Sequence, residues 1–169
     1  MIRVEETFLL KELPKELKKC KKIEIEQGYI SEASDPIRIR KRGDSYSVTR
    51  KIMAIPGNQS LREHLDIPID KQDFDVLWKN VSRSLKKNRY YYSQTMDYEI
   101  RVDEFMGDLK GIYLIELIFA DETARGNFES PAWFGRSVTK EDWASNSYLA
   151  GKTTSEIEPH LEGILPSEN

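Results

Sequence analysis

Apolar and polar residues alternate along most of this chain, and a period of two predicts β-strands. The clearest case is Pro36–Lys51, PIRIRKRGDSYSVTRK, in which two alternating runs flank a turn at Gly43-Asp44. This pattern predicts a β-hairpin with one apolar face and one face of arginine and lysine, and guanidinium groups in such a row suit phosphate oxygens. Further strands are expected over Ile2–Leu10, Ile23–Ile30, Ser60–Ile69, Lys87–Gln94, Asp97–Phe105 and Gly111–Phe119.

Three segments have helical character instead. Lys71–Leu85 follows a capping Asp70 and carries apolar residues at helical spacing, which are expected to be core: Phe74, Leu77, Trp78, Val81 and Leu85. Leu13–Lys22 is a short basic helical segment, and Thr139–Ala150 contains short helical pieces opened by Thr139. Three aromatic residues of the tail are expected to pack outside the strands or to close one end: Trp133, Phe134 and Trp143.

About eight strands, one central helix and a small helical tail predict an α+β protein. A closed or nearly closed antiparallel barrel leaves no free strand edges. The polar strand faces would then share a wet interior. Its lining is expected to include Arg38, Arg40, Thr49, Lys51, Lys87, Arg89, Glu99, Arg101, Asp103 and Glu116.

The composition describes an ordinary globular protein. The chain has 169 residues, 38% hydrophobic and 33% charged, which predicts one domain over 1–169 with a real core. The residues from about 152 are expected to be partly irregular and Pro166–Asn169 to be frayed. The formal net charge of −3 argues against a general nucleic-acid binder, but it leaves room for a local basic cavity.

The location follows from what the sequence lacks. Cys20 stands alone, so no disulfide framework or thiolate metal cluster is expected, and a reducing compartment fits. No apolar signal segment or membrane-length stretch is found, so a cytoplasmic location without a membrane partner is predicted. His64 and His160 lie far apart, which argues against a histidine triad or a zinc site.

Seven short motifs follow one another along the chain: VEETFLL, QGYI, IRIRKRGDSYSVTRK, KNRY, VDEF, LIEL and SNSYLA. Their order and spacing resemble the CYTH, or triphosphate tunnel metalloenzyme, family over Arg3 to about Ala150. The resemblance implies an eight-stranded antiparallel barrel, or tunnel, with helices packed outside. In the family, basic side chains inside the tunnel hold a triphosphate, and carboxylates hold one or two Mg²⁺ or Mn²⁺ ions.

The resemblance also assigns residues. Those at the family's phosphate-binding positions are Arg38, Arg40, Lys51, Lys87 and Arg89. The candidate metal ligands are Glu5, Asp103 and Glu116, and no catalytic base stands out. The chain departs from the family's acidic and lysine positions at Arg3, Thr7, Arg101 and Ile118, so one ion, or none, is expected in place of two.

These residues support four hypotheses about the function. The first is a metal-dependent triphosphatase that acts on inorganic triphosphate or a nucleotide. The second is a degenerate tunnel that binds polyphosphate or nucleotide with little or no turnover, as Arg3, Thr7 and Arg101 favour. The third is a class IV adenylyl cyclase, and the fourth is a set of purely structural ion pairs across the sheet. The partner is a triphosphate-containing small molecule, and a homodimer stays open.

Overall fold

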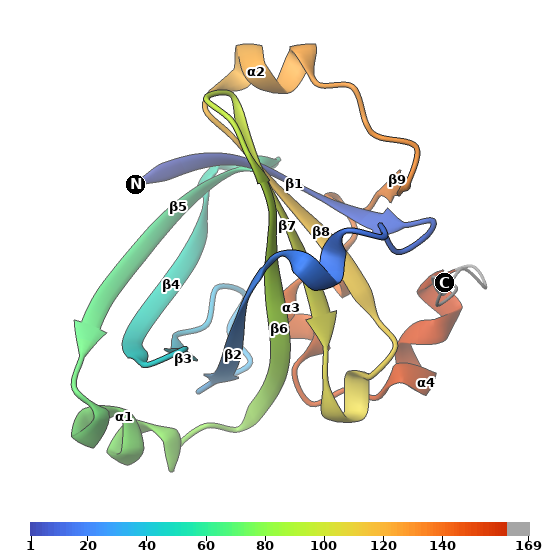
Figure 1. Cartoon of the computed structure of the whole chain (residues 1–169). Coiled ribbons are helices and arrows are strands. Elements are labelled where there is room, and N and C mark those ends of the chain that lie inside the picture. Colours follow the sequence, from blue (N-terminus) through green and yellow to red (C-terminus); the bar gives the residue numbers. More distant parts are fainter. Residues whose placement is uncertain (162–169) are drawn as a thin grey trace.

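Eight antiparallel strands close into a barrel in this computed structural model, which describes residues 1–161. Their sheet order is β5-β4-β3-β2-β6-β7-β8-β1, and β1 pairs back with β5 to close it (Figure 1). This arrangement confirms the predicted α+β class and the eight-stranded antiparallel barrel. The strands are β1 (Ile2–Leu10), β2 (Lys21–Tyr29), β3 (Arg38–Arg42), β4 (Ser45–Ile55), β5 (Asn58–Ile69), β6 (Arg83–Gln94), β7 (Tyr98–Phe105) and β8 (Tyr113–Phe119).

The closure between β1 and β5 is short. Only the first part of β1 pairs with β5, with Ile2 opposite Glu63 and Val4 opposite Leu61. Farther along, β1 pairs with β8 on one side and with β9 (Phe134–Ser137) on the other. The rest of β5 is therefore paired with β4 alone.

Short helices complete the described chain. They are η1 (Leu17–Lys19), α1 (Lys71–Trp78), η2 (Gly107–Leu109), α2 (Glu122–Asn127), η3 (Asp142–Ala144), α3 (Asn146–Leu149), α4 (Thr154–Ile157) and η4 (Glu158–Leu161). Figure 1 shows α1 and α2 outside the strands, at opposite ends of the barrel. Among residues 1–161, no helix has the length and apolarity needed to cross a membrane.

Two of the predicted helices are wrong in extent. The helix expected over Lys71–Leu85 ends at Trp78, because Arg83 already begins β6 and Leu85 pairs with Gln27 of β2. The helix expected over Leu13–Lys22 shrinks to the single turn η1, since Lys21 and Lys22 belong to β2. In both cases pairing with a distant strand overrides a local helical pattern.

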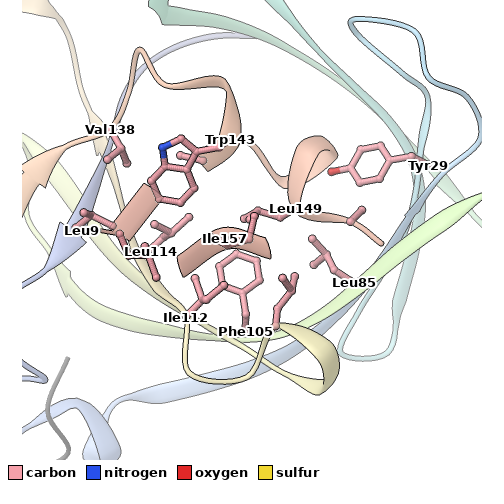
Figure 2. Close-up of a cluster of buried hydrophobic side chains, with 14 residues drawn as sticks. Leu9, Tyr29, Leu85, Phe105, Ile112, Leu114, Val138, Trp143, Leu149 and Ile157 are labelled. Carbon is pink, nitrogen blue, oxygen red and sulfur yellow. The ribbon is translucent and has the colours of Figure 1, made fainter. Parts of the chain in front are cut away.

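The C-terminal elements close one end of the barrel. We call Asp142–Leu161 the C-terminal plug. Its apolar side chains pack among inward-facing strand residues at that end (Figure 2). The main members are Leu9, Tyr29, Leu85, Phe105, Ile112, Leu114, Val138, Trp143, Leu149 and Ile157. Residues 154–161 are thus helical and packed, whereas the predicted frayed end, 166–169, lies outside the described residues.

A second apolar cluster covers the outer face of β1, β7 and β8. Val4, Phe8 and Leu10 alternate in β1 with the inward-facing Glu5 and Leu9. The connection from α2 to β9 lies over this face, with Phe134 in the cluster and Phe128 and Trp133 packed against it. Trp133 and Phe134 therefore pack outside the barrel, while Trp143 closes its end.

Candidate functional site: a charged cavity inside the barrel

The barrel encloses a cavity of about 480 Å³ between the C-terminal plug and the β1–β5 seam. Alternate residues of the strands point into it, as the period of two predicts. Its lining includes all predicted phosphate-binding residues and two of the predicted metal ligands: Arg38, Arg40, Lys51, Lys87, Arg89, Glu5 and Glu116. Asp103 is 1% exposed and lies behind Lys87 and Arg89.

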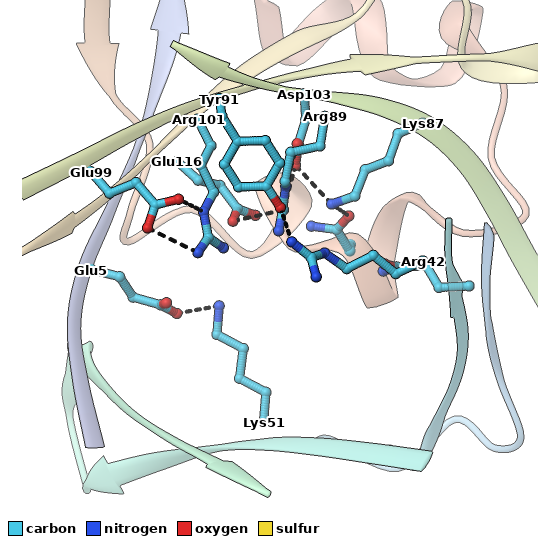
Figure 3. A network of polar contacts seen from close by, with 12 residues as sticks. Glu5, Arg42, Lys51, Lys87, Arg89, Tyr91, Glu99, Arg101, Asp103 and Glu116 are labelled. Carbon is cyan, nitrogen blue, oxygen red and sulfur yellow. Dashed lines mark hydrogen bonds and ion pairs between the residues drawn. The ribbon is translucent and has the colours of Figure 1, made fainter. Parts of the chain in front are cut away.

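One side of the cavity is a network of ion pairs, which we call the ion-pair wall: Lys87 and Arg89 of β6, Asp103 of β7 and Glu116 of β8 (Figure 3). Lys87 Nζ donates to Asp103 Oδ2 at 2.7 Å. Arg89 holds both oxygens of Asp103, at 2.8 and 2.9 Å, and its Nη2 also donates to Glu116 Oε2 at 2.9 Å. The two carboxylates therefore take up much of the positive charge of Lys87 and Arg89.

Protonation in this wall reflects burial and pairing together. Burial alone would raise the pKa of Asp103, but Arg89 and Lys87 hold it below the usual range. The pKa of Glu116 is likewise held well below its ordinary value against the effect of burial, mainly by Arg89 and Lys87. Burial lowers the pKa of Lys87 to about 8, although Asp103 opposes this shift. All of these groups are thus charged near neutral pH, with the ammonium of Lys87 nearest to titration.

The opposite side of the cavity carries two arginines whose positive charges are not hydrogen-bonded to any carboxylate among the described residues. We call Arg38 and Arg40 of β3 the arginine wall. Arg38 Nε donates to Thr49 Oγ1 at 2.6 Å, a neutral partner. The Nε of Arg40 is buried and has no hydrogen-bond partner among the described residues. Burial, then the charges of Arg38 and Arg89, lower the pKa of Arg40 to about 9, and the carboxylate of Asp66 opposes this shift. This guanidinium is therefore poised to bind an anion.

Glu5 lies on a third side, between the two walls. It pairs with Lys51, and its Oε2 lies 3.3 Å from Nε2 of His64 (Figure 3 shows the Lys51 contact). Burial would raise the pKa of Glu5, but Lys51 and His64 outweigh it and lower the pKa to about 2. His64 is a cavity residue that the sequence analysis set aside. The sequence clue to His64 was its position in the predicted strand Ser60–Ile69. The structure pairs it with Lys51 of the neighbouring strand.

Arg101, which the sequence analysis predicts to be a departure from the family pattern, also reaches the cavity. Its Nε and Nη2 donate to Glu99 of the same strand at 2.8 and 3.2 Å. Its guanidinium also lies 5.6 Å from the ring centre of Tyr91, whose hydroxyl accepts a hydrogen bond from Arg42. Arg101 is therefore compensated by its own strand neighbour and contributes less free positive charge than Arg40.

The C-terminal plug contributes polar residues that carried no predicted role. Asp142, Ser145, Asn146 and Ser147 line the cavity. Asn146 Oδ1 accepts a hydrogen bond from Lys87 Nζ at 2.8 Å. The signal in the sequence was the segment SNSYLA, but no local pattern placed it beside a lysine almost sixty residues away in the chain.

The predicted metal ligands do not form a metal site in this arrangement. Among residues 1–161, no group of three or more His, Cys, Asp or Glu side chains is placed to hold an ion. Each candidate already faces a cation: Glu5 faces Lys51, and Asp103 and Glu116 face Arg89. A divalent ion held by all three carboxylates therefore does not fit the described side-chain positions.

Comparisons with known proteins identify relatives with one activity. No family model matches the chain. An inorganic triphosphatase of Nitrosomonas europaea is 31% identical over 153 residues, which cover 89% of this chain and 97% of that protein. The chain belongs to the CYTH-like family of this relative. An inorganic triphosphatase of Acetivibrio thermocellus is 31% identical over 124 residues, or 73% of this chain and 77% of that protein.

Two solved structures agree with the barrel fold. A crystal structure of an inorganic triphosphatase matches with a TM-score of 0.64 and 28% identity, over 88% of this chain and 93% of the other. A protein of Pyrococcus horikoshii matches with a TM-score of 0.55 and 15% identity, over 73% of this chain and 82% of the other. The second match shows the fold alone.

Proposed function

We propose that this chain hydrolyses inorganic triphosphate in the cavity of its barrel. Arg40 carries the proposal: it is a half-buried guanidinium beside two other arginines, with a pKa lowered to about 9 and a buried Nε that lacks a hydrogen-bond partner among the described residues. A buried donor without a partner is costly, and a polyanion would relieve the cost by charge-assisted hydrogen bonding. The naming of two relatives as inorganic triphosphatases supports the same substrate.

The lining supports a compact inorganic anion over a nucleotide. Tyr29 supplies the one phenol or indole ring among the described residues that line the cavity, and it is 4% exposed. Its hydroxyl already accepts a hydrogen bond from Gln27. Recognition of a nucleobase relies on stacking surfaces and on hydrogen bonds to its edge. A charged, mostly ring-free lining suits phosphate groups without a base.

Hydrolysis in this site would depend on positioning and charge. The arginine wall would bind phosphate oxygens by charge-assisted hydrogen bonds, Lys87 would contribute from the opposite ion-pair wall, and Lys51 would contribute from the side between them. Charge on the transferred phosphoryl group and on the leaving oxygen is stabilised by such preorganised cations. No side chain is needed as a strong base, because phosphoryl transfer makes little demand on one.

We further propose that Mg²⁺ or Mn²⁺ enters as part of the substrate, bound to the triphosphate. The described carboxylates are occupied by Lys51, Lys87 and Arg89, which supports a metal–triphosphate complex over a resident ion. Calorimetry of the free protein with MgCl₂ should then show no binding, and rates should follow the concentration of the metal–triphosphate complex. Stoichiometric Mg²⁺ binding to the free protein would contradict this part of the proposal.

The ion-pair wall favours one alternative, a receptor that binds triphosphate with little or no turnover. Asp103 and Glu116 are both held by Arg89, so they are poorly placed to assist catalysis. The deciding experiment is phosphate release from inorganic triphosphate with Mg²⁺ or Mn²⁺, run beside calorimetric binding of the same anion. ATP is the matched control substrate, expected to react more slowly. Tight binding without release would establish the receptor, and no binding would reject both functions.

A further inference from the structure

We propose that Asn146 of the C-terminal plug is a positioning residue that aims Lys87 at the bound triphosphate. The inference rests on the proposed function of the cavity. It gives the plug, whose apolar side chains only close the barrel, a second role in the site itself.

The hydrogen bonds of Lys87 carry the inference. Its ammonium has three N–H donors. One donates to Asp103 Oδ2 at 2.7 Å and one to Asn146 Oδ1 at 2.8 Å. Lys87 is 3% exposed and lines the cavity, and its Nζ lies 5.7 Å from the centre of the Phe105 ring. Two fixed acceptors thus set the direction of the ammonium and leave one donor for a ligand.

Asn146 is itself held firmly. Ser145 caps α3 by accepting from the amide of Tyr148 at 3.2 Å, and Leu149 of the same helix is fully buried. Arg83 Nε, at the start of β6, donates to the carbonyl of Ser147 at 3.1 Å. β6 therefore holds the helix that carries the acceptor, and β6 also carries Lys87. An acceptor on a packed element fixes its partner better than one on a loose loop.

An uncharged hydrogen-bond acceptor suits position 146, beside the ammonium of Lys87. Lys87 shares the carboxylate of Asp103 with Arg89, so the lysine retains positive charge for an anion. A second carboxylate at position 146 would cancel that charge and repel phosphate. An amide oxygen orients the ammonium and adds no charge of its own. Without it, the flexible four-carbon side chain of Lys87 would have Asp103 as its remaining fixed partner.

The test is a double-mutant cycle on triphosphate binding. Asn146→Leu removes the acceptor and fills its volume, so that water does not replace it. We expect the Kd for inorganic triphosphate, measured by calorimetry without metal, to rise about tenfold. In a Lys87→Met background the same substitution should change the Kd less than twofold, because the residue that Asn146 positions is gone. If Asn146→Leu fails to fold, Asn146→Ala replaces it in the cycle.

Thr153→Ala is the matched control. It removes the capping box of α4 in the same plug, where Thr153 bonds Glu156, and it touches neither Lys87 nor the cavity. It should lower the Tm and leave the Kd unchanged, whereas Asn146→Leu should raise the Kd. Equal losses in both Lys87 backgrounds, or a raised Kd in Thr153→Ala, would show a purely structural role and overturn the inference. Wild-type protein that does not bind triphosphate would instead reject the proposed function, and the inference with it.

Discussion

The two walls of the cavity look alike in the sequence and differ in the structure. The arginine wall, Arg38 and Arg40 of β3, and the cations of the ion-pair wall, Lys87 and Arg89 of β6, both stand on alternating strands rich in basic residues. On the ion-pair wall, Lys87 and Arg89 share the carboxylate of Asp103, and Glu116 also pairs with Arg89. On the arginine wall, Arg40 Nε has no partner within residues 1–161. A basic strand face therefore does not by itself reveal how much charge is free for a ligand.

Strand register explains the difference. Arg89 stands directly opposite Asp103 of β7, so the two charges meet by pairing geometry alone. Arg40 stands between Gln27 of β2 and Ser47 of β4, both neutral. The hypothesis of structural ion pairs thus describes the ion-pair wall and fails for Arg40. The ion pairs of one wall hold the barrel together and leave one donor of Lys87 for a ligand, whereas most of the donors of the other wall are left for an anion.

Removal of Asp103 should break the ion-pair wall and give the largest effect on stability. Asp103→Asn leaves Lys87 and Arg89 as buried cations without their shared carboxylate. We expect the free energy of unfolding to fall by about 3–5 kcal/mol in urea titrations. Asp44→Asn makes the same change at an exposed position in the turn between β3 and β4, outside the cavity, and should cost under about 0.5 kcal/mol. Similar losses in both variants would contradict the contrast between the walls.

Acid should weaken the protein through Glu5, which lies between the walls. The pKa of Glu5 is lowered from 4.5 to about 2, so between these values the unfolded chain binds more protons than the folded one. The contribution of Glu5 is complete above pH 4.5 and is lost as the pH falls toward 2, by about 3 kcal/mol. Unfolding titrations from pH 6 to 2.5 measure it. Glu5→Gln should flatten this slope, and an unchanged slope would show that other carboxylates dominate.

Removal of Arg40 should affect the ligand and spare the fold. Arg40→Met deletes a half-buried cation that has no hydrogen bond to a carboxylate among the described residues, so stability should hold or rise slightly. The Kd for inorganic triphosphate should rise by about thirtyfold to a hundredfold, the range for charge-assisted hydrogen bonds. Lys41→Met, on the opposite face of the same strand, is the control and should leave the Kd unchanged. A variant that loses stability but keeps affinity would support the structural reading instead.

The smallest effect is expected at Arg101. This side chain is 15% exposed and pairs with Glu99, two residues away on the same strand and 20% exposed, so the pair should contribute about 1 kcal/mol to stability, the net value of an ordinary hydrogen bond. Because Glu99 compensates its charge, Arg101→Gln should weaken triphosphate binding by less than about threefold, against the larger loss in Arg40→Met. Urea denaturation of Arg101→Gln and Arg40→Met measures the free energy of unfolding, and calorimetry of the same two variants measures the Kd for triphosphate. A loss as large as that of Arg40→Met would place Arg101 among the main phosphate ligands.

Much of the fold could be read from alternation along the chain. The Arg38–Lys51 hairpin and the strands after it follow from local periodicity, and the inward set that includes Arg38, Arg40 and Lys51 follows from the same period. The wrong secondary-structure predictions lie where local helical spacing conflicts with pairing to a strand distant in sequence. The apolar spacing of Val81 and Leu85 fits a helix, but pairing with β2 draws Leu85 into a strand.

The sequence alone determined which residues face the interior, because side-chain direction in a strand depends only on position along the chain. Tertiary structure decided which of their charges remain free. Pairing of Arg89 with Asp103, isolation of Arg40, and the contacts of Asn146 with Lys87 and of His64 with Glu5 all join residues distant in sequence. Strand register and the packing of the plug set these contacts, and neither leaves a local pattern in the chain.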